Sequence, residues 1–532
     1  MLRKVFLCAA FCFFLIFIQL LYVSAESCAD DLVKDPAISL KHALVRGIEK
    51  NLGLQAKKLD IPINREAVVI DESKFDPVLD ASVLSLEEKT PTASAFAAED
   101  FDLYRSTGAD IGIGKIFGIG LESRLSFEAN RSMNNSSVDA LRPQYSNFVI
   151  LDLTQPLFRD FGSKINTTDL RISQNMVRQT VYGYLDSAQE TGKIIETTYY
   201  DLAKNLKILT HRIESETLTM ELLEGNRKKF EAGLVPVTEV QEAETELASR
   251  NEKVVLARQQ ADIVSNRLKD LLEIRAGDLC YKERLVPEPA GSALQPFPDQ
   301  EMALEIAFEK RPDLLRQRIE LANRDIRIEY FDNQMLPRVD LEATLGVNGF
   351  AGDNRPVSLS GFNASTSPYQ GNFSDALSDM SEGEGYEWYV GLRMSCPLGN
   401  RAAAARLRRA GQEKQKVIYL LKSLEGKVET DVKNAMVAVE GSLERVKVTE
   451  RFEKLAEITL EQEMERLKNG LSDTFRVLTF QNNLIEARIR KVTALVDFNK
   501  GLAGLYRAMG TNLARFNIVA ELNGEEINYE KN

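Results

Sequence analysis

The chain has 532 residues, of which 27% are charged and 44% hydrophobic, and its net charge is -12 at pH 7. This acidity argues against a nucleic-acid partner, which would require clustered Lys and Arg side chains. One Trp and two His residues leave little material for histidine-based catalysis or a histidine-rich metal site.

The first residues have the pattern of a signal peptide. A positively charged stretch, residues 2–4, precedes an apolar run over residues 5–22, and Val23-Ser24-Ala25 offers the small residues that a signal peptidase recognises. We predict a signal peptide over residues 1–25, with cleavage between Ala25 and Glu26. The alternative is an uncleaved membrane anchor, because the apolar run is long enough to span a bilayer. The small residues and the polar residues after them favour export.

Several segments alternate between apolar and polar side chains. Residues 119–128 do so strictly, and residues 341–348 and 388–395 follow the same pattern in the second half of the chain. Such runs are typical of membrane β-barrel strands, although an antiparallel sheet with one solvated face alternates in the same way. One chain has too few strands to close a barrel, and an exposed sheet edge invites pairing with another chain. We therefore expect closure by oligomerisation.

Long heptad patterns follow the first group of strands. Apolar residues between Ile195 and Phe230 recur at alternating spacings of four and three, which predicts a supercoiled helix. A helix from about Ile165 to Lys229 would be roughly 95 Å long at 1.5 Å per residue. The pattern resumes after Gly233 and appears again after Gly470. A plain coiled-coil strut would show the same heptads, but small residues in the descending helices favour closer packing in a larger assembly.

The chain contains an internal repeat. The segments 233–240 and 470–477 are the same Gly-Leu turn followed by a helix, and the match continues downstream at the same offset. Upstream, Ala43-Leu44 corresponds to Ala303-Leu304, and Pro156-Leu157 corresponds to Pro397-Leu398. A repeat of this size indicates two copies of one structural unit. Each copy is predicted to contain a helix, strands, a long helix, a turn and a second long helix.

The repeat sets the predicted domain organisation. The first repeat is residues 26–296, with barrel strands at about 78–155 and a helical tip at 233–240. The second repeat is residues 297–510, with strands at about 338–397 and a tip at 470–477. Residues 511–532 form a C-terminal tail.

Three cysteines remain after removal of the signal peptide, namely Cys28, Cys280 and Cys396. They form no Cys-x-x-Cys pair and have no His nearby in sequence, so we expect no metal site. Cys28 and Cys280 both fall just outside the long helices and are a candidate disulfide in an oxidising compartment. Whether they are bonded stays open.

The motifs together resemble the TolC family of outer-membrane efflux proteins, from about Ile38 to Gly510. The resemblance is carried by the two Gly-Leu turns, Arg311-Pro312-Asp313-Leu314, Leu336-Pro337, Thr154-Gln155-Pro156-Leu157-Phe158 and Cys396-Pro397-Leu398-Gly399-Asn400. It implies an α+β membrane protein in the cell outer membrane, a homotrimer with one shared β-barrel in outer-membrane lipid. A long α-helical coiled-coil barrel would continue it across the periplasm.

The same resemblance implies a role for the two Gly-Leu turns. They would lie at the periplasmic tip, where the duct meets a periplasmic adaptor (membrane fusion protein) linked to an inner-membrane pump or ABC exporter. Glycine suits the reversal between two helices because it adopts positive φ. The predicted docking residues are Gly233, Leu234, Val235, Thr238, Glu239, Gly470, Leu471 and Ser472.

The second tip departs from the family pattern. Some members close the duct with a ring of acidic residues, whereas this chain has Arg476 and Thr479 at the corresponding positions. A ring of arginines would repel itself, so either gating differs or Arg476 pairs with an acid such as Glu239 or Asp473. A solvated Arg476 is the simpler alternative. The candidate gate residues are Glu239, Asp473, Arg476 and Thr479.

The first repeat also carries extra residues between Pro77 and Pro156. The segments 78–86, 110–117, 118–129 and 148–154 would make four strands there against two in the second repeat. Two per repeat, as the family implies, give twelve strands in a trimer, and six per chain would give eighteen. We favour twelve, with the additional hairpin outside the barrel wall. Residues 88–109 and 349–386, rich in Ser, Gly, Asn and Asp, are predicted to be external loops.

The predicted function is a passive exit duct of a tripartite efflux pump or a type I secretion system, with no catalysis, cofactor or metal. His42 and His211 have no nucleophile or ligand cluster near them in sequence, which argues against an enzyme. The alternative function is a periplasmic coiled-coil adaptor or scaffold without a barrel. The transported substrate stays open, because the pump determines it.

Overall fold

The structure is a computed structural model that describes residues 37–93, 99–136, 139–278, 281–288, 296–355, 357–359, 362–363, 367–383, 385–518, 521–522 and 525–526. The signal peptide with its Ala25–Glu26 cleavage site and the cysteines Cys28 and Cys280 lie outside these residues, whereas Cys396 is a free, exposed thiol. The chain divides into two units. We call Asp60–Val181 with Arg316–Lys422 the sheet unit, and Met1–Leu59, Tyr182–Leu315 and Ser423–Asn532 the helical unit.

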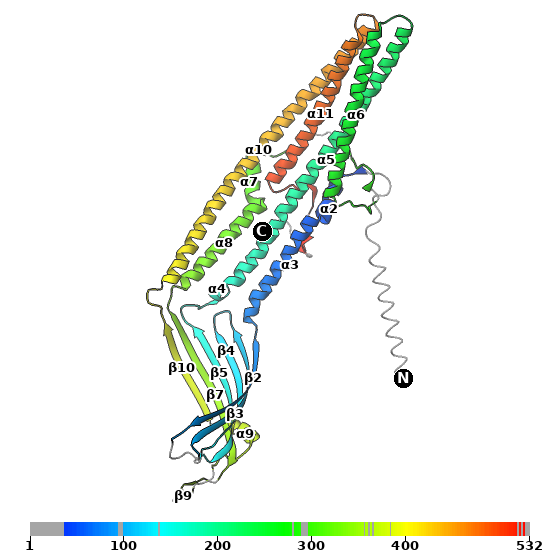
Figure 1. The fold of residues 1–532 in the computed structure, drawn as a ribbon. Coiled ribbons are helices and arrows are strands. Elements are labelled where there is room, and N and C mark those ends of the chain that lie inside the picture. Colours follow the sequence, from blue (N-terminus) through cyan, green and yellow to red (C-terminus); the bar gives the residue numbers. More distant parts are fainter. Residues whose placement is uncertain are drawn as a thin grey trace, which may run out of the picture. The chain divides into compact units, whose positions relative to one another are not determined.

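The sheet unit is built on one antiparallel sheet of six long strands (Figure 1). Its strands are β2 (Val78–Pro91), β3 (Phe101–Ile116), β4 (Glu122–Asn134), β5 (Leu141–Pro156), β7 (Arg338–Asn354) and β10 (Gly385–Ser395). Their order is β10-β7-β5-β4-β3-β2, so the two repeats meet where β5 pairs with β7. Within the described residues, β2 and β10 form the two edges of this sheet.

Four of the six strands come from the first repeat, and all four lie in the same sheet. Our expectation that the extra hairpin would lie apart from the other strands is therefore wrong. Pro77 precedes β2 as Pro337 precedes β7, and β5 and β10 each lead to a Pro-Leu pair, so β3–β4 is the inserted hairpin. Backbone pairing places it between β2 and β5. Side-chain alternation alone carries no information on which strands are neighbours.

The two predicted external loops are also more ordered than expected. Strand β2 continues to Pro91 and β3 already begins at Phe101, because backbone pairing goes on after the apolar alternation stops. The stretch 349–386 contains the end of β7, the short strands β8 (Ser358–Leu359) and β9 (Phe362–Asn363), and helix α9 (Phe373–Glu382). A capping box formed by Asn372 and Asp375 starts α9.

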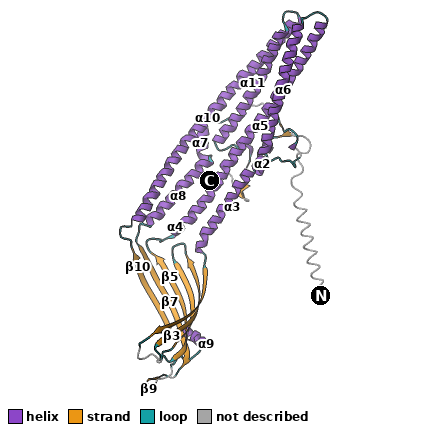
Figure 2. Ribbon diagram, viewed as in Figure 1, coloured by secondary structure: helices purple, strands orange, loops and turns teal. Residues whose placement is uncertain are grey.

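The predicted long helices are confirmed (Figure 2). Helix α5 (Thr168–Glu231) has 64 residues and α10 (Arg401–Lys468) has 68, and each contributes residues to both units. The helices that follow the two turns, α6 (Val237–Leu271) and α11 (Thr474–Ala508), have 35 residues each. Among the described residues, none of the helices combines the length and apolar character that a membrane span requires.

Shorter elements complete the chain. They are β1 (Ala37–Ile38), α2 (Leu40–Lys50), α3 (Leu52–Glu72), the 3-10 turn η1 (Ser73–Phe75), α4 (Ser163–Asn166), β6 (Val286–Pro287), α7 (Gln300–Lys310), α8 (Pro312–Asn333), the 3-10 turn η3 (Ala514–Phe516), β11 (Glu521–Leu522) and β12 (Glu525–Glu526).

Each repeat has its own hydrophobic core in the helical unit. In the first repeat, α2 packs against α5 and α6 through side chains such as Leu44, Ile195 and Leu268. In the second, Ala303 of α7 belongs to a cluster with residues of α10 and α11, such as Val432. Most heptad positions are thus buried in both copies, as the spacing predicts, whereas Ile213, Met220 and Phe230 of α5 are exposed.

Candidate functional site at the helical tips

Both long helices end in the same backbone motif. At the end of α5, the Gly233 N–H bonds to the Phe230 carbonyl at 2.9 Å and the Leu234 N–H to the Lys229 carbonyl at 2.8 Å. At the end of α10, the Gly470 and Leu471 N–H groups make the equivalent bonds at 3.1 and 2.9 Å. These pairs define a Schellman motif, which satisfies the last carbonyls of a helix.

The two glycines are needed for their backbone conformation. Their φ angles are 72° and 71°, in the left-handed region. In the described part of the chain, no atom lies within 4 Å of a Cβ built on Gly233 or Gly470. A side chain would therefore find space but would strain the backbone, by about 1–2 kcal/mol for an ordinary L-residue.

The tips present apolar side chains to solvent. Leu234 is 75% exposed and its counterpart Leu471 is 68% exposed, with Phe475 at 64% and Val237 at 46% nearby. Exposed large apolar side chains grouped in one place are typical of a protein-binding surface. The predicted docking residues Gly233, Leu234, Thr238, Gly470 and Leu471 are all exposed, whereas Val235, Glu239 and Ser472 are half-buried.

A small polar network connects the two repeats at the tip. Buried Thr474 of the second repeat donates its hydroxyl to Glu239 Oε2 at 2.8 Å. Buried Asn226 of the first repeat donates its amide to Thr474 Oγ1 at 3.0 Å and to the Glu239 carbonyl at 3.3 Å. Glu239 is therefore held in place by contacts within its own chain.

Arg476 pairs with Glu463, which is neither of the two acids that the sequence suggested. Its Nε lies 3.1 Å from Glu463 Oε1, and the Ser472 hydroxyl donates to the same carboxylate. The Glu463 side chain is only 5% exposed, whereas that of Arg476 is 48% exposed. Asp473 instead caps α11, accepting a bond from the Arg476 backbone N–H at 2.8 Å.

The four candidate gate residues consequently do not form one cluster in the chain. Thr479 donates its hydroxyl to the Phe475 carbonyl of its own helix, and each of the other three has a different partner. Sequence reasoning missed Asn226, Glu463 and Thr474. Asn226 and Glu463 could have been found as polar residues on a heptad seam. Asn226 lies three residues after buried Leu223, and Glu463 lies three residues after buried Leu460.

A second buried polar group lies further along the same helices. Arg250 of α6 is 2% exposed and donates to Glu246 Oε1 at 3.0 Å, to the Ser215 carbonyl at 3.0 Å and to Gln481 Oε1 at 3.3 Å. Burial lowers the pKa of the Arg250 guanidinium, and the carboxylate of Glu246 opposes this shift. The side chain thereby ties α6 to α5 and to α11.

The sheet has one apolar and one polar face. Cross-strand neighbours on the apolar face form rows, one of which is Leu79, Ile113, Leu125, Leu151, Leu345 and Trp388. Five such rows, from Leu341 and Leu392 to Val83 and Gly349, extend over roughly 27 Å at a strand rise of about 3.4 Å per residue. At the tilt of about 35–45° that barrel strands have, this length corresponds to a height of roughly 20 Å, close to the apolar band of about 25 Å in outer-membrane barrels.

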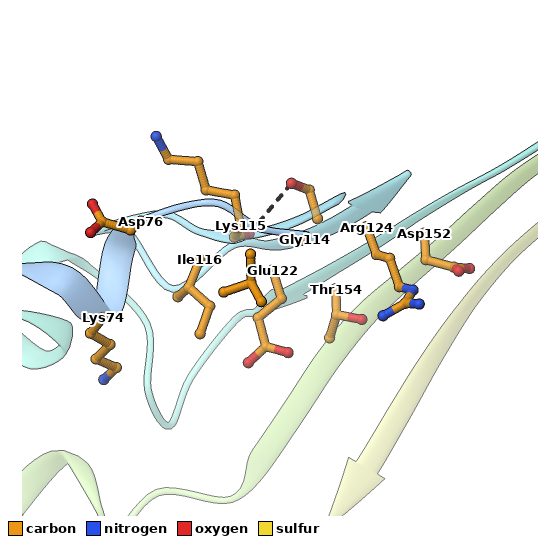
Figure 3. A pocket seen from close by; sticks show the side chains of 11 residues that line it. Lys74, Asp76, Gly114, Lys115, Ile116, Glu122, Arg124, Asp152 and Thr154 are labelled. Carbon is orange, nitrogen blue, oxygen red and sulfur yellow. Dashed lines mark hydrogen bonds between the residues drawn. The ribbon is translucent and has the colours of Figure 1, made fainter. Parts of the chain in front are cut away.

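The polar face carries charged ladders and a hollow of about 390 Å³ (Figure 3). Arg124 pairs with Asp80 at 3.0 Å and with Asp110 at 3.3 Å, while Thr344 donates to Asp152 at 2.6 Å. Gly114, having no side chain, leaves the hollow open between β2 and β4. Among the described residues no group of three His, Cys, Asp or Glu side chains could hold a metal ion. The arrangement provides a wetted wall and no catalytic constellation.

Comparison with known proteins agrees with this geometry. The family model described as outer membrane efflux protein matches residues 123–272 and 303–511, one segment in each repeat. No curated protein sequence matches the chain.

Among solved structures, the outer-membrane channel OprN has 16% identity and a TM-score of 0.61, over 88% of this chain and 89% of its own. The Campylobacter jejuni CmeC channel has 16% identity and a TM-score of 0.60, over 89% and 86%. The Vibrio cholerae outer membrane protein VceC has 13% identity and a TM-score of 0.59, over 88% and 96%. At such low identities, the TM-scores and coverages establish a shared fold and no more. Because these structures are outer-membrane channels, the shared fold contradicts the alternative of a coiled-coil adaptor without a barrel.

Proposed function

Because the chain belongs to the outer membrane efflux protein family, we propose that it forms the exit duct of a tripartite efflux pump or a type I secretion system. Its place is the cell outer membrane, with the helical part extending into the periplasm, and its family consists of channels rather than enzymes. Three copies would conduct substrates passively from an inner-membrane pump or ABC exporter, through a periplasmic adaptor, to the exterior. The partners would supply the energy.

The observation that carries this proposal is the two-faced sheet with two edges that have no neighbour among the described residues. Its apolar face fits lipid and its polar face fits an aqueous pore. An open sheet cannot lie in a membrane, because its edge groups would lose hydrogen bonds to water, so closure with further copies is required.

Helix α3 supports assembly from several copies. Its exposed apolar side chains recur at heptad-like spacings of seven, four and seven, namely at Leu52, Leu59, Ile63 and Ile70. Each of them is more than 60% exposed. An apolar stripe of this kind on a helix surface is typical of a helix that packs against another one in an assembly.

Cell fractionation and channel recording test the duct. We expect the protein in the outer membrane as a detergent-extractable, heat-modifiable trimer that forms ion-conducting pores in planar bilayers. Recovery in the inner membrane or in the soluble periplasm would contradict the proposal.

A pair of double variants tests adaptor docking at the tips. Replacing Gly233 and Gly470 with Val should abolish export, because β-branched residues disfavour positive φ and distort both turns. The control replaces both with Asn, which tolerates the left-handed region and should retain most export. Trimer formation should be unchanged in both variants. Export that survives in the Val variant would show that the turns are not the docking site.

A further inference from the structure

We propose that the wall of the assembled duct has eighteen strands, closed by pairing of β2 of each copy with β10 of the next. The inference rests on the trimer of the proposed function and departs from the twelve strands that two strands per repeat would give. It assigns a partner, a second copy of this chain, to each edge of the sheet.

Backbone pairing places the inserted hairpin inside the wall. Strand β3 pairs with β4 without interruption from Tyr104↔Asn134 to Ile116↔Glu122, and with β2 from Pro91↔Phe101 to Val78↔Gly114. A strand has two edges, and both edges of β4 are occupied, by β3 and by β5. A twelve-stranded wall without the inserted hairpin β3–β4 would therefore have to open the β2–β3 and β4–β5 ladders, and one without β2 and β3 would have to open the β3–β4 ladder. Each lost backbone hydrogen bond would cost about 1 kcal/mol.

The apolar face of the inserted strands is suited to lipid. Ile113 on β3 and Leu125 on β4 continue the row of Leu79 and Leu151, and each is 47% exposed in the single chain. Ile111, in a neighbouring row on the same face, is 48% exposed. A hairpin outside the wall would keep these side chains in water, whereas a place in the wall buries them in the membrane.

The polar face continues across the insertion as well. Arg124 on β4 bridges Asp110 on β3 and Asp80 on β2, so one charged ladder runs over the three strands. The hollow above Gly114 is lined from the same strands and from β5. The apolar and polar faces of the inserted strands thus continue the apolar and polar faces of the rest of the sheet.

The two edge strands are complementary. Strand β2 leaves α3 and β10 leads into α10, so neighbouring copies would bring them together in opposite directions. On β10, Trp388, Val390 and Leu392 lie on the apolar face and are at least 60% exposed. The β2–β3 and β7–β10 ladders contain no register shift, and within β2 proline occurs only at its last residue. The edges therefore lack two of the devices that proteins use to block pairing, namely bulges and interior prolines.

The consequence is a wider pore. Barrel diameter grows roughly in proportion to strand number, so eighteen strands give a diameter about 1.5 times that of twelve. The insertion would line this pore with Asp110, Arg124 and Glu128. The exit would accept larger cargo than a twelve-stranded wall of the same tilt.

Disulfide cross-linking between copies tests the strand number. In the full chain with Cys28, Cys280 and Cys396 replaced by Ser, a reporter cysteine is placed on β10, either Trp388→Cys or Leu392→Cys. Each reporter is combined in turn with single cysteines on the apolar face of β2, namely Leu79→Cys, Ala81→Cys and Val83→Cys. Oxidised outer membranes are then analysed on denaturing gels.

Each β2 position has a matched control on β4 in the same cross-strand row, namely Leu125→Cys, Phe127→Cys and Ala129→Cys. In an eighteen-stranded wall β4 lies three strands from β10, about 14 Å away, so it is too distant for a disulfide. We expect at least one β2 position to give on the order of tenfold more cross-linked product than its control.

The outcomes separate the two proposals. Cross-links from β10 to β4 instead of β2 would establish a twelve-stranded wall without β2 and β3. A disulfide within one copy between Leu79→Cys on β2 and Leu151→Cys on β5, which lie three strands apart in an eighteen-stranded wall, would establish a twelve-stranded wall without β3–β4. Either result would overturn this inference while leaving the trimeric duct intact. A trimer with no cross-link at any position would also overturn it. A protein that migrates as a monomer without cross-links would contradict the proposed function itself.

Discussion

The two helical tips have the same backbone and different chemistry. Their glycine φ angles differ by one degree, and both turns make the same pair of backbone hydrogen bonds. Beneath them, the first repeat has a buried amide, Asn226, where the second has a buried carboxylate, Glu463, paired with Arg476. The turn geometry allows few residues, whereas a buried polar position requires only that its partners satisfy it.

The same contrast recurs away from the tips. Two residues beyond the ends of α6 and α11, the equivalent residues Glu273 and Gly510 have φ of 51° and 75°. Arg250 is buried in α6, and its counterpart in α11 is the fully buried Ala487. Comparing the repeats thus identifies substitutions that the fold has already accepted on one side, and three predictions follow from exchanging them.

The largest effect is expected at Arg250. Replacing it with Ala, the residue of the second repeat, should destabilise the protein by about 3–5 kcal/mol, because Glu246 loses its ion pair, Gln481 loses a donor and a cavity remains. The control Arg250→Met keeps most of the volume without the buried charge and should lose less than half as much. Denaturant unfolding of the purified protein measures both. If Arg250→Ala and Arg250→Met lost the same stability, the side-chain volume at this position would contribute nothing beyond the charge.

The contact between Glu196 of α5 and Arg515, in the segment after α11, should make the stability of the protein depend on pH. Burial raises the pKa of Glu196 on α5 to about 7, although Arg515, 3.5 Å away, lowers it. The folded protein therefore holds a proton that the unfolded chain releases near the ordinary value of 4.5. Stability should fall as the pH rises from about 4.5 to about 7 and then level off, by on the order of 3 kcal/mol. Unfolding of the wild type and of Glu196→Gln at pH 5 and pH 8 tests this, since the variant should lose this component. An identical pH dependence in both proteins would refute it.

Exchanging the helix ends should give effects of opposite sign. Gly510→Glu introduces a Cβ 3.0 Å from the Lys310 carbonyl oxygen and a side chain at positive φ, so it should cost about 2 kcal/mol. Glu273→Gly relieves the same backbone strain and should stabilise by up to about 1 kcal/mol, since its ion pair with half-exposed Arg275 contributes little. Thermal unfolding compares the two variants. A loss of stability in both would mean that the side chain of Glu273 outweighs its backbone strain.

The smallest effect is expected at the tip. Glu463→Gln keeps the acceptor for Ser472 and leaves Arg476 solvated, so it should destabilise by about 1 kcal/mol or less. The opposite exchange, Asn226→Asp, removes two donated hydrogen bonds and buries a carboxylate close to Glu239, so it should cost several times more. Local hydrogen exchange near the tip resolves both changes. Equal effects of the two variants would contradict the expected difference between the buried amide and the buried carboxylate.

Much of the fold was predictable from local patterns. The heptad spacing located the first long helix to within three residues at each end, and the repeated Gly-Leu segment located both turns. The candidate site was predictable only in part. Tertiary packing brought Glu463 against Arg476 and Thr474 against Glu239, and these pairs come from residues 13 and 235 positions apart.

The sequence by itself determined periodicity, duplication and the positions that require glycine, because these depend on the residues of one local segment. Only the tertiary structure decided which strands are neighbours, and therefore that β3–β4 enters the sheet between β2 and β5. A strand's alternation specifies its two faces but not its partner, since backbone hydrogen bonds are the same for every sequence. The two turns at Gly233 and Gly470 follow from the positive φ that glycine adopts. The strand order of the sheet, in contrast, follows from hydrogen bonding between segments that are distant in sequence.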